Sequence, residues 1–115
     1  MKTVEEYMAS GMDERTARYF ASGRRRIVSA RAIEGYSVSL VFDNGEKRVL
    51  DCKDCFFPGS VFNKIAATDD FARVFVDDSG NLAWDIDANV DSNKVWNNRI
   101  DCCRDACYLK SVPAS

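Results

Sequence analysis

The sequence of 115 residues contains no histidine. This absence removes the commonest general base near neutral pH and every Ser-His or Cys-His nucleophile arrangement. No P-loop and no G-x-G-x-x-G pattern occurs, so a phosphate-cradling loop is not indicated. Because no nucleophile, base and orienting group come together in the sequence, we expect a protein that is not an enzyme, with no catalytic residues and no cofactor.

Long hydrophobic runs are also missing. Nowhere do about 18 apolar residues follow one another, and the first ten residues lack the apolar core that a signal peptide needs. We therefore expect a cytoplasmic protein that does not associate with membranes. Cysteines are mostly reduced in that compartment, and the odd count of five argues further against a secreted disulfide framework.

The composition is that of a folded globular chain, with 46% hydrophobic and 30% charged residues. The length predicts one domain over residues 1–115. The net charge of −2 is unevenly spread, because residues 1–32 carry seven basic and four acidic side chains and the remainder carries nine and fourteen. Such an asymmetry can guide a partner electrostatically.

The clearest structural signal is a β-hairpin over residues 36–51. Asn44-Gly45 stands between two alternating, β-prone runs, which is the strongest short-range hairpin signal. A two-residue turn would place Asp43 opposite Glu46, and two carboxylates in that position repel each other.

A three-residue loop over 43–45 would instead pair Phe42 with Glu46 and Val38 with Leu50. The two registers place the side chains of the return strand on opposite faces of the sheet. We favour the three-residue loop because it separates the carboxylates, and it requires a positive φ at Gly45.

Short helices are predicted before this hairpin, over residues 4–9 and 14–22. Gly11 ends the first, while Asp13 and Gly23 flank the second as N-cap and C-terminal stop. Both are too short to persist alone, so we expect them to dock on the sheet.

The remaining elements follow from local patterns. Residues 27–33 form a predicted strand, 73–77 and 82–86 a second hairpin, and 52–55 and 61–66 helical turns. Asp91 is a candidate cap for a short helix that carries Val95 and Trp96, and a loose tail is expected around Pro113. The fold class is thus α+β: a mainly antiparallel sheet of about five strands in hairpins, with two short N-terminal helices and short helices packed on it.

Two stretches carry a resemblance to a known family. They are Leu40-Val-Phe-Asp-Asn-Gly-Glu-Lys-Arg-Val-Leu-Asp51 and Phe71-Ala-Arg-Val-Phe-Val-Asp-Asp-Ser-Gly-Asn-Leu-Ala-Trp84, followed by an Asp-rich turn. Their order and spacing resemble the domain-of-unknown-function family 2442 over about residues 27–97. The chain then divides into a helical N-terminal extension (1–26), a family-like α+β core (27–97) and a Cys-containing C-terminal segment (98–115).

The resemblance implies a small α+β fold and little about activity. Some relatives are encoded beside a second small domain in arrangements that look like toxin and antitoxin pairs, and others carry a helix-turn-helix domain. The arginine-rich N-terminal segment and the cysteine-rich C-terminal segment of this chain lie outside the shared core. A DNA-binding role is therefore not carried over.

The cysteines are the candidate metal ligands. Cys52-x-x-Cys55 supplies two thiolates, and two of Cys102, Cys103 and Cys107 would complete a tetrahedral zinc site. The second group lacks the C-x-x-C spacing, and a free cysteine is often a small buried hydrophobe. We therefore favour structural thiols and no metal, with zinc, or a disulfide such as Cys52–Cys55 or one near the C-terminus, as alternatives.

One basic cluster, Arg24-Arg25-Arg26, is the candidate partner-binding site, because arginine pairs bidentately with phosphate or carboxylate. The whole chain is acidic, with a pI near 5.1, whereas nucleic-acid-binding domains are typically basic. Internal pairing with acidic residues is the competing interpretation. Five aromatic residues are interpreted as core rather than as a ligand groove: Trp84, Trp96, Phe56, Phe57 and Tyr108.

These observations favour a small non-enzymatic protein-protein interaction module, with a protein partner or a second copy bound through an exposed strand edge. The antitoxin-like half of a two-gene system is one form that it would take. A nucleic-acid-associated regulator that uses Arg24–Arg26 is the first alternative, and a thiol- or zinc-dependent structural or redox protein is the second.

Overall fold

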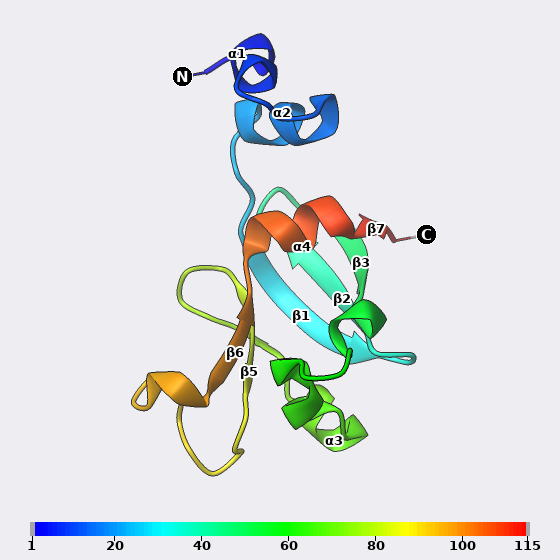
Figure 1. Cartoon of the computed structure of the whole chain (residues 1–115), viewed down its shortest axis with the longest axis vertical. Coiled ribbons are helices and arrows are strands. Elements are labelled where there is room, and N and C mark those ends of the chain that lie inside the picture. The colour runs from blue at the N-terminus through cyan, green and yellow to red at the C-terminus, as the bar shows by residue number, and fades with distance from the viewer. Residues whose placement is uncertain (1, 115) are drawn as a thin grey trace.

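The computed structural model describes residues 2–114 and confirms an α+β fold (Figure 1). The helices are α1 (Val4–Ala9), α2 (Glu14–Ala21), α3 (Thr68–Phe71) and α4 (Arg104–Lys110), with 3-10 turns η1 (Lys53–Cys55), η2 (Val61–Ile65) and η3 (Trp96–Asn98). The strands are β1 (Ile27–Ile33), β2 (Ser37–Phe42), β3 (Lys47–Asp51), β4 (Phe75–Val76), β5 (Leu82–Asp85), β6 (Arg99–Cys102) and β7 (Val112–Pro113). No helix among the described residues is long and apolar enough to cross a membrane.

The β2–β3 hairpin has the three-residue loop. Val38 lies opposite Leu50, and the Phe42 N–H donates to the Glu46 carbonyl at 2.9 Å. Gly45 has φ +86°, as that loop requires. The predicted register is therefore confirmed, and it buries Val38, Leu40 and Phe42 on one face of the sheet.

The strands form two antiparallel sheets rather than the single sheet of about five strands that the sequence predicted. The first has the order β1-β2-β3-β7 and the second β4-β5-β6. The second predicted hairpin is real but β4 is only two residues long, and β5 gains a further neighbour in β6, which the sequence analysis did not predict. The two sheets meet where the Ile27 N–H donates to the Gly80 carbonyl at 3.0 Å.

One hydrophobic core joins the sheets. Trp84 on β5 is fully buried, and its indole N–H donates to the Phe71 carbonyl at 2.9 Å. The other members come from both sheets, the connecting turns and α4: Ile27, Val38, Leu40, Phe42, Leu50, Cys52, Ile65, Phe71, Leu82, Ile100 and Cys107. The only hydrogen-bond donor of the buried Trp84 side chain, its indole N–H, thus has a partner.

Both N-terminal helices begin where predicted, and α2 ends one residue before the predicted end, but neither docks on a sheet. The Asp13 side chain accepts from the Thr16 N–H at 2.8 Å, as an N-cap does. Instead of meeting a strand, Tyr19 of α2 stacks on Tyr108 of α4 with ring centroids 4.8 Å apart. The prediction that these helices dock on the sheet was wrong because the sequence analysis did not predict α4. This helix lies between the helical extension and the first sheet (Figure 1).

Two further expectations near the C-terminal end are also wrong. The tail at Pro113 is not loose, because Val112 pairs with Val49 and the Ala114 N–H donates to the Lys47 carbonyl at 2.9 Å. The helix expected after Asp91 is a turn, closed by the Lys94 and Val95 N–H groups on the Asp91 carbonyl and followed by η3. Neither segment is long enough for periodicity to reveal its structure.

Candidate functional site

The candidate partner-binding arginines all have intramolecular contacts. Arg24 forms an ion pair with Asp105 at 2.7 Å, and Arg26 donates to the Asp78 carbonyl at 2.8 Å. Arg25 donates to the Gly23 carbonyl and lies over the Tyr108 ring, with its guanidinium carbon 6.0 Å from the ring centroid. Of the three, Arg24 makes the pairing with an acidic side chain that the competing interpretation expected, whereas Arg25 and Arg26 donate to backbone carbonyls.

Four of the five cysteines line a common pocket. Cys52 precedes η1, Cys55 ends it, Cys102 ends β6, and Cys107 lies on α4. The chain thus brings them together from distant parts of the sequence. Cys103 lies elsewhere, exposed, and its thiol is 3.8 Å from Asp105 Oδ2. Between residues 2 and 114 no group of three or more His, Cys, Asp or Glu side chains is arranged to hold a metal ion.

We call this hollow the thiol pocket. Its volume is about 910 Å³, and η1, η2, α4 and β7 surround it. Its lining residues are Arg15, Leu50, Asp51, Cys52, Asp54, Cys55, Phe57, Gly59, Ser60, Val61, Phe62, Cys102, Ala106, Cys107, Leu109, Lys110, Ser111 and Val112. Mostly apolar walls with a few charged groups are typical of a binding pocket.

The four thiols of the pocket differ in acidity. Burial raises the pKa of Cys52 to about 12, and burial likewise raises the pKa of Cys55. A hydrogen bond from the Cys107 thiol lowers the pKa of Cys102, and the same bond together with burial raises the pKa of Cys107. The Cys107 thiol itself donates to the Cys102 carbonyl oxygen at 3.8 Å.

Three large apolar side chains of the pocket reach solvent. Phe57 is 58% exposed, Val61 48% and Val112 60%. Isolated exposed apolar residues are normal on a protein surface, but these three share one hollow. The pocket thus combines an apolar floor with an apolar rim.

Charged residues of both signs line the thiol pocket. Arg15 comes from α2 and Lys110 from α4, whereas Asp51 ends β3 and Asp54 lies in η1. Asp51 also lies 4.0 Å from Lys53 through its carboxylate. A ligand in the pocket therefore meets charges of both signs.

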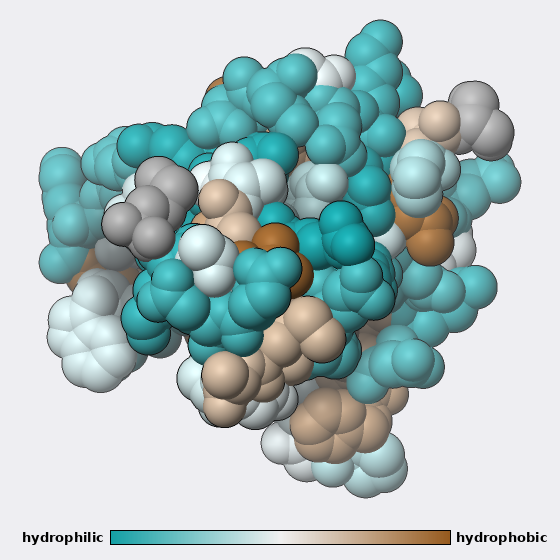
Figure 2. Space-filling view, turned by 90° about the horizontal axis from the view of Figure 1, so that it is seen from above, coloured by the Kyte–Doolittle hydropathy of each residue, from teal (hydrophilic) through white to brown (hydrophobic). Residues whose placement is uncertain are grey.

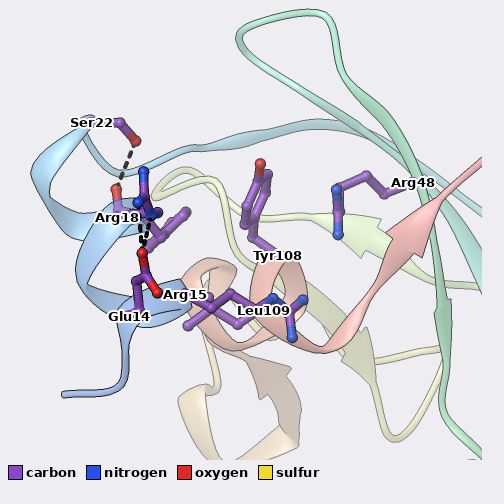
Figure 3. A pocket seen from close by; sticks show the side chains of 8 residues that line it. Glu14, Arg15, Arg18, Ser22, Arg48, Tyr108 and Leu109 are labelled. Atoms are coloured by element: carbon purple, nitrogen blue, oxygen red, sulfur yellow. Dashed lines mark hydrogen bonds and ion pairs between the residues drawn. The ribbon is translucent and has the colours of Figure 1, made fainter.

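A second pocket of about 610 Å³ lies between α2 and α4 (Figure 3). Tyr108 forms part of its wall, and Arg48 stacks on that ring with its guanidinium carbon 4.5 Å from the centroid. Arg48 also donates to the Ser111 hydroxyl and carbonyl, both at 2.7 Å, and pairs with Glu46 at 3.2 Å. These contacts occupy the guanidinium of Arg48 within the protein and make it a structural residue.

The sequence analysis missed most of the thiol pocket. It singled out the cysteines and considered Phe57 among the aromatic residues, but not Val61, Lys110 or Val112 as site residues. The apolar Leu109 and Val112 beside Cys107 were the available signal, yet they indicate a pocket wall only once α4 and β7 are known. Of the other aromatic residues, Trp84 is core as interpreted, while Trp96 is 86% exposed.

Comparison with known proteins identifies one family. The family model for proteins of unknown function, DUF2442, matches residues 27–101. Searches of curated proteins and of solved structures found no match. The matched region begins at β1 and extends through most of β6, beyond the limit of 97 that the sequence resemblance suggested, and it covers more than half of the 115 residues. The chain therefore belongs to the DUF2442 family.

Proposed function

We propose that this chain is a non-enzymatic interaction module whose thiol pocket binds an apolar segment of a partner protein. One observation carries the proposal: Phe57, Val61 and Val112 are all exposed and all line the same pocket of about 910 Å³. Burying such a rim against a partner removes apolar surface from water, which is the main driving force of association.

The charges around the pocket indicate the kind of segment. An amphipathic helix would place its apolar stripe on the rim and floor, as in other helix-in-groove complexes. Its acidic side chains would face Arg15 and Lys110, and its basic side chains would face Asp51 and Asp54.

The end of the molecule that carries α1 and α2 is less suited to binding an apolar segment. The end that carries α1 and α2 is mostly hydrophilic, with hydrophobic residues in small separate areas (Figure 2). Some DUF2442 relatives are encoded beside a second small domain, an arrangement that favours an antitoxin-like role. In that role the partner is the product of a neighbouring gene and both proteins act in the cytoplasm.

The test is affinity purification of the tagged protein from its host, with two matched variants. Phe57→Ser removes the aromatic rim of the pocket, and Trp96→Ser removes a more exposed aromatic residue outside it. We expect one stoichiometric partner with the wild type and with Trp96→Ser. Loss of a central apolar anchor costs about 2 kcal/mol, so Phe57→Ser should bind roughly thirtyfold more weakly.

Other results would contradict the proposal. The proposal is wrong if the purified protein is a monomer and no stoichiometric partner is recovered with it. It is also wrong if the partner is lost with Trp96→Ser but retained with Phe57→Ser. Recovery of only a second copy of this chain would replace the partner protein with self-association. Circular dichroism of both variants checks that their folds are unchanged.

A further inference from the structure

Two pockets of this chain adjoin one another. The thiol pocket of about 910 Å³ and the pocket of about 610 Å³ between α2 and α4 share two lining residues, Arg15 and Leu109. Figure 3 shows both side chains where α2 faces α4. Each volume lies in the range of sites that bind small molecules. One ligand can therefore occupy part of each pocket by passing over Arg15 and Leu109.

The thiol pocket supplies an apolar wall for one part of such a ligand. Leu50 is buried, Phe62 and Leu109 are partly buried, and Phe57 and Val112 are exposed at the rim. An alkyl chain that lies along these side chains removes apolar surface of the ligand and of the protein from water, which is favourable. The thiol pocket is thus suited to an alkyl chain.

The pocket between α2 and α4 has a surplus of positive charge. Arg15, Arg18 and Arg48 line it, and Glu14 is the one acidic residue beside them in the described part of the chain. Arg18 pairs with Glu14 at 2.6 Å, and Arg48 pairs with Glu46 at 3.2 Å. No ion pair among residues 2–114 involves Arg15. The guanidinium of Arg15 is therefore available to an anionic group.

Acidic residues make the thiol pocket the poorer place for an anion. Asp51 and Asp54 line that pocket but not the pocket between α2 and α4. Their two negative charges exceed the positive charge of Lys110, which also lines the thiol pocket alone. An anionic group is therefore drawn toward Arg15, whereas an alkyl chain is drawn into the thiol pocket.

We propose that the two pockets together bind a single-chain amphiphile with an anionic head, of which a medium-chain fatty acid is the simplest example. The alkyl tail lies along Phe57, Phe62 and Leu109 in the thiol pocket, and the carboxylate pairs with Arg15. Binding is reversible and involves no covalent step. The ligand differs from the partner segment proposed above, although both use the thiol pocket.

Isothermal titration calorimetry of the full chain with octanoate, decanoate and dodecanoate, each below its micelle concentration, tests the tail. We expect one equivalent to bind, with an affinity that rises with chain length by up to about fourfold per buried methylene. Decan-1-ol has the chain of decanoate without its charge and should bind about fivefold more weakly. Decyltrimethylammonium, which has a positive head, should bind more weakly still.

Two charge variants locate the head group. Arg15→Gln removes the cation that the two pockets share, and Lys110→Gln removes the cation that lines the thiol pocket alone. Both side chains are exposed, so neither substitution disturbs the core. We expect Arg15→Gln to weaken decanoate binding about fivefold and to leave decan-1-ol unchanged, with a smaller effect of Lys110→Gln. Phe57→Ser should weaken both ligands, because it removes part of the apolar wall.

Several results would overturn the site. It is absent if decanoate shows no saturable binding, or if many equivalents bind as a detergent does. Equal affinities for decanoate and decan-1-ol would exclude the anionic head, and a larger loss with Lys110→Gln than with Arg15→Gln would exclude its placement at Arg15. The titrations contain no partner protein, so their outcome is independent of the interaction proposed above. Circular dichroism checks that each variant is folded.

Discussion

Tyr108 joins three parts of the chain through one side chain. Tyr19 of the helical extension stacks on one part of its ring, and Phe42 of β2 meets it edge-on with centroids 5.1 Å apart. Arg48 of β3 also packs on the ring, and the Tyr108 hydroxyl donates to Glu46 at 2.9 Å. Aromatic pairs and cation–π contacts each stabilise a fold modestly, so their convergence on one residue matters more than any single contact.

Replacement of Arg48 by lysine should destabilise the protein although the charge is kept. Lysine cannot reproduce the planar fork that donates to Ser111 and Glu46 while it stacks on Tyr108. We expect a loss of about 2 kcal/mol in the free energy of unfolding, measured by urea denaturation.

Arg18→Lys is the matched control. Arg18 forms an exposed pair with Glu14 one turn away, and such pairs contribute less than about 0.5 kcal/mol. Equal losses in the two variants would show that the buried fork of Arg48 has no special importance.

The two hairpins have turns that look alike in sequence but differ in their surroundings. Gly45 and Gly80 both have positive φ, +86° and +79°. A Cβ at Gly45 would meet nothing within 4 Å, whereas a Cβ at Gly80 would lie 2.9 Å from the Cβ of Arg26. The second turn is thus packed against the segment that enters β1, and the first is open to solvent.

Alanine at these two positions separates backbone strain from crowding. Gly45→Ala should cost about 1 kcal/mol, because an L-residue is strained at positive φ. Gly80→Ala carries the same strain and also displaces Arg26, so we expect a clearly larger loss in thermal unfolding. Equal losses would mean that Arg26 moves aside freely.

Local sequence patterns predicted some elements well and others not at all. Asn44-Gly45 predicted both the hairpin and its register, because turn chemistry and carboxylate repulsion act within a few residues. β7 and β6 could not be predicted in the same way. Val112 belongs to a strand only because Val49 lies beside it, and that pairing depends on the whole fold.

The residues of the candidate site were also predictable only where local sequence identifies them. The cysteines were recognised as a group from their residue type, but which of them meet depends on where β6 and α4 lie. Cys102 and Cys103 are neighbours in the chain and face different surroundings, which no spacing rule distinguishes. The arginine cluster was ambiguous in sequence because its partner Asp105 lies far along the chain.

The molecule as a whole is elongated, with extents of 46 × 33 × 30 Å and a radius of gyration of 15.2 Å. A compact chain of this length would have a radius of about 13 Å. The difference arises because α1 and α2 lie beyond α4 at one end (Figure 1). Arg24 and Tyr19 hold this extension to α4 through the Asp105 carboxylate.

Acid should loosen this attachment. Burial alone would raise the pKa of Asp105, but the hydrogen bonds from Arg24 and Tyr19 outweigh it, so the pKa lies below the ordinary value of 3.8. The unfolded chain therefore binds this proton more readily than the folded protein does. Its contribution to stability is complete above pH 3.8 and is lost as pH falls through the lower folded pKa.

Hydrogen exchange and small-angle scattering test this expectation. Below about pH 4, amides of α2 should lose protection before those of β1–β3, and the radius of gyration should rise. In Asp105→Asn the α2 amides should already be less protected at neutral pH and should change less on acidification. If the protection of the α2 amides depends on pH in the same way in the wild type and in Asp105→Asn, Asp105 is not the acid-sensitive contact.

The pairing of β7 with β3 has a consequence for synthesis on the ribosome. β3 leaves the exit tunnel long before Val112 and Pro113 are made, and until then its outer edge has unpaired backbone groups. A nascent strand in that state is a template for pairing with another chain. Arrival of β7 closes the edge, and Pro113, which has no N–H to donate, helps to end the sheet there.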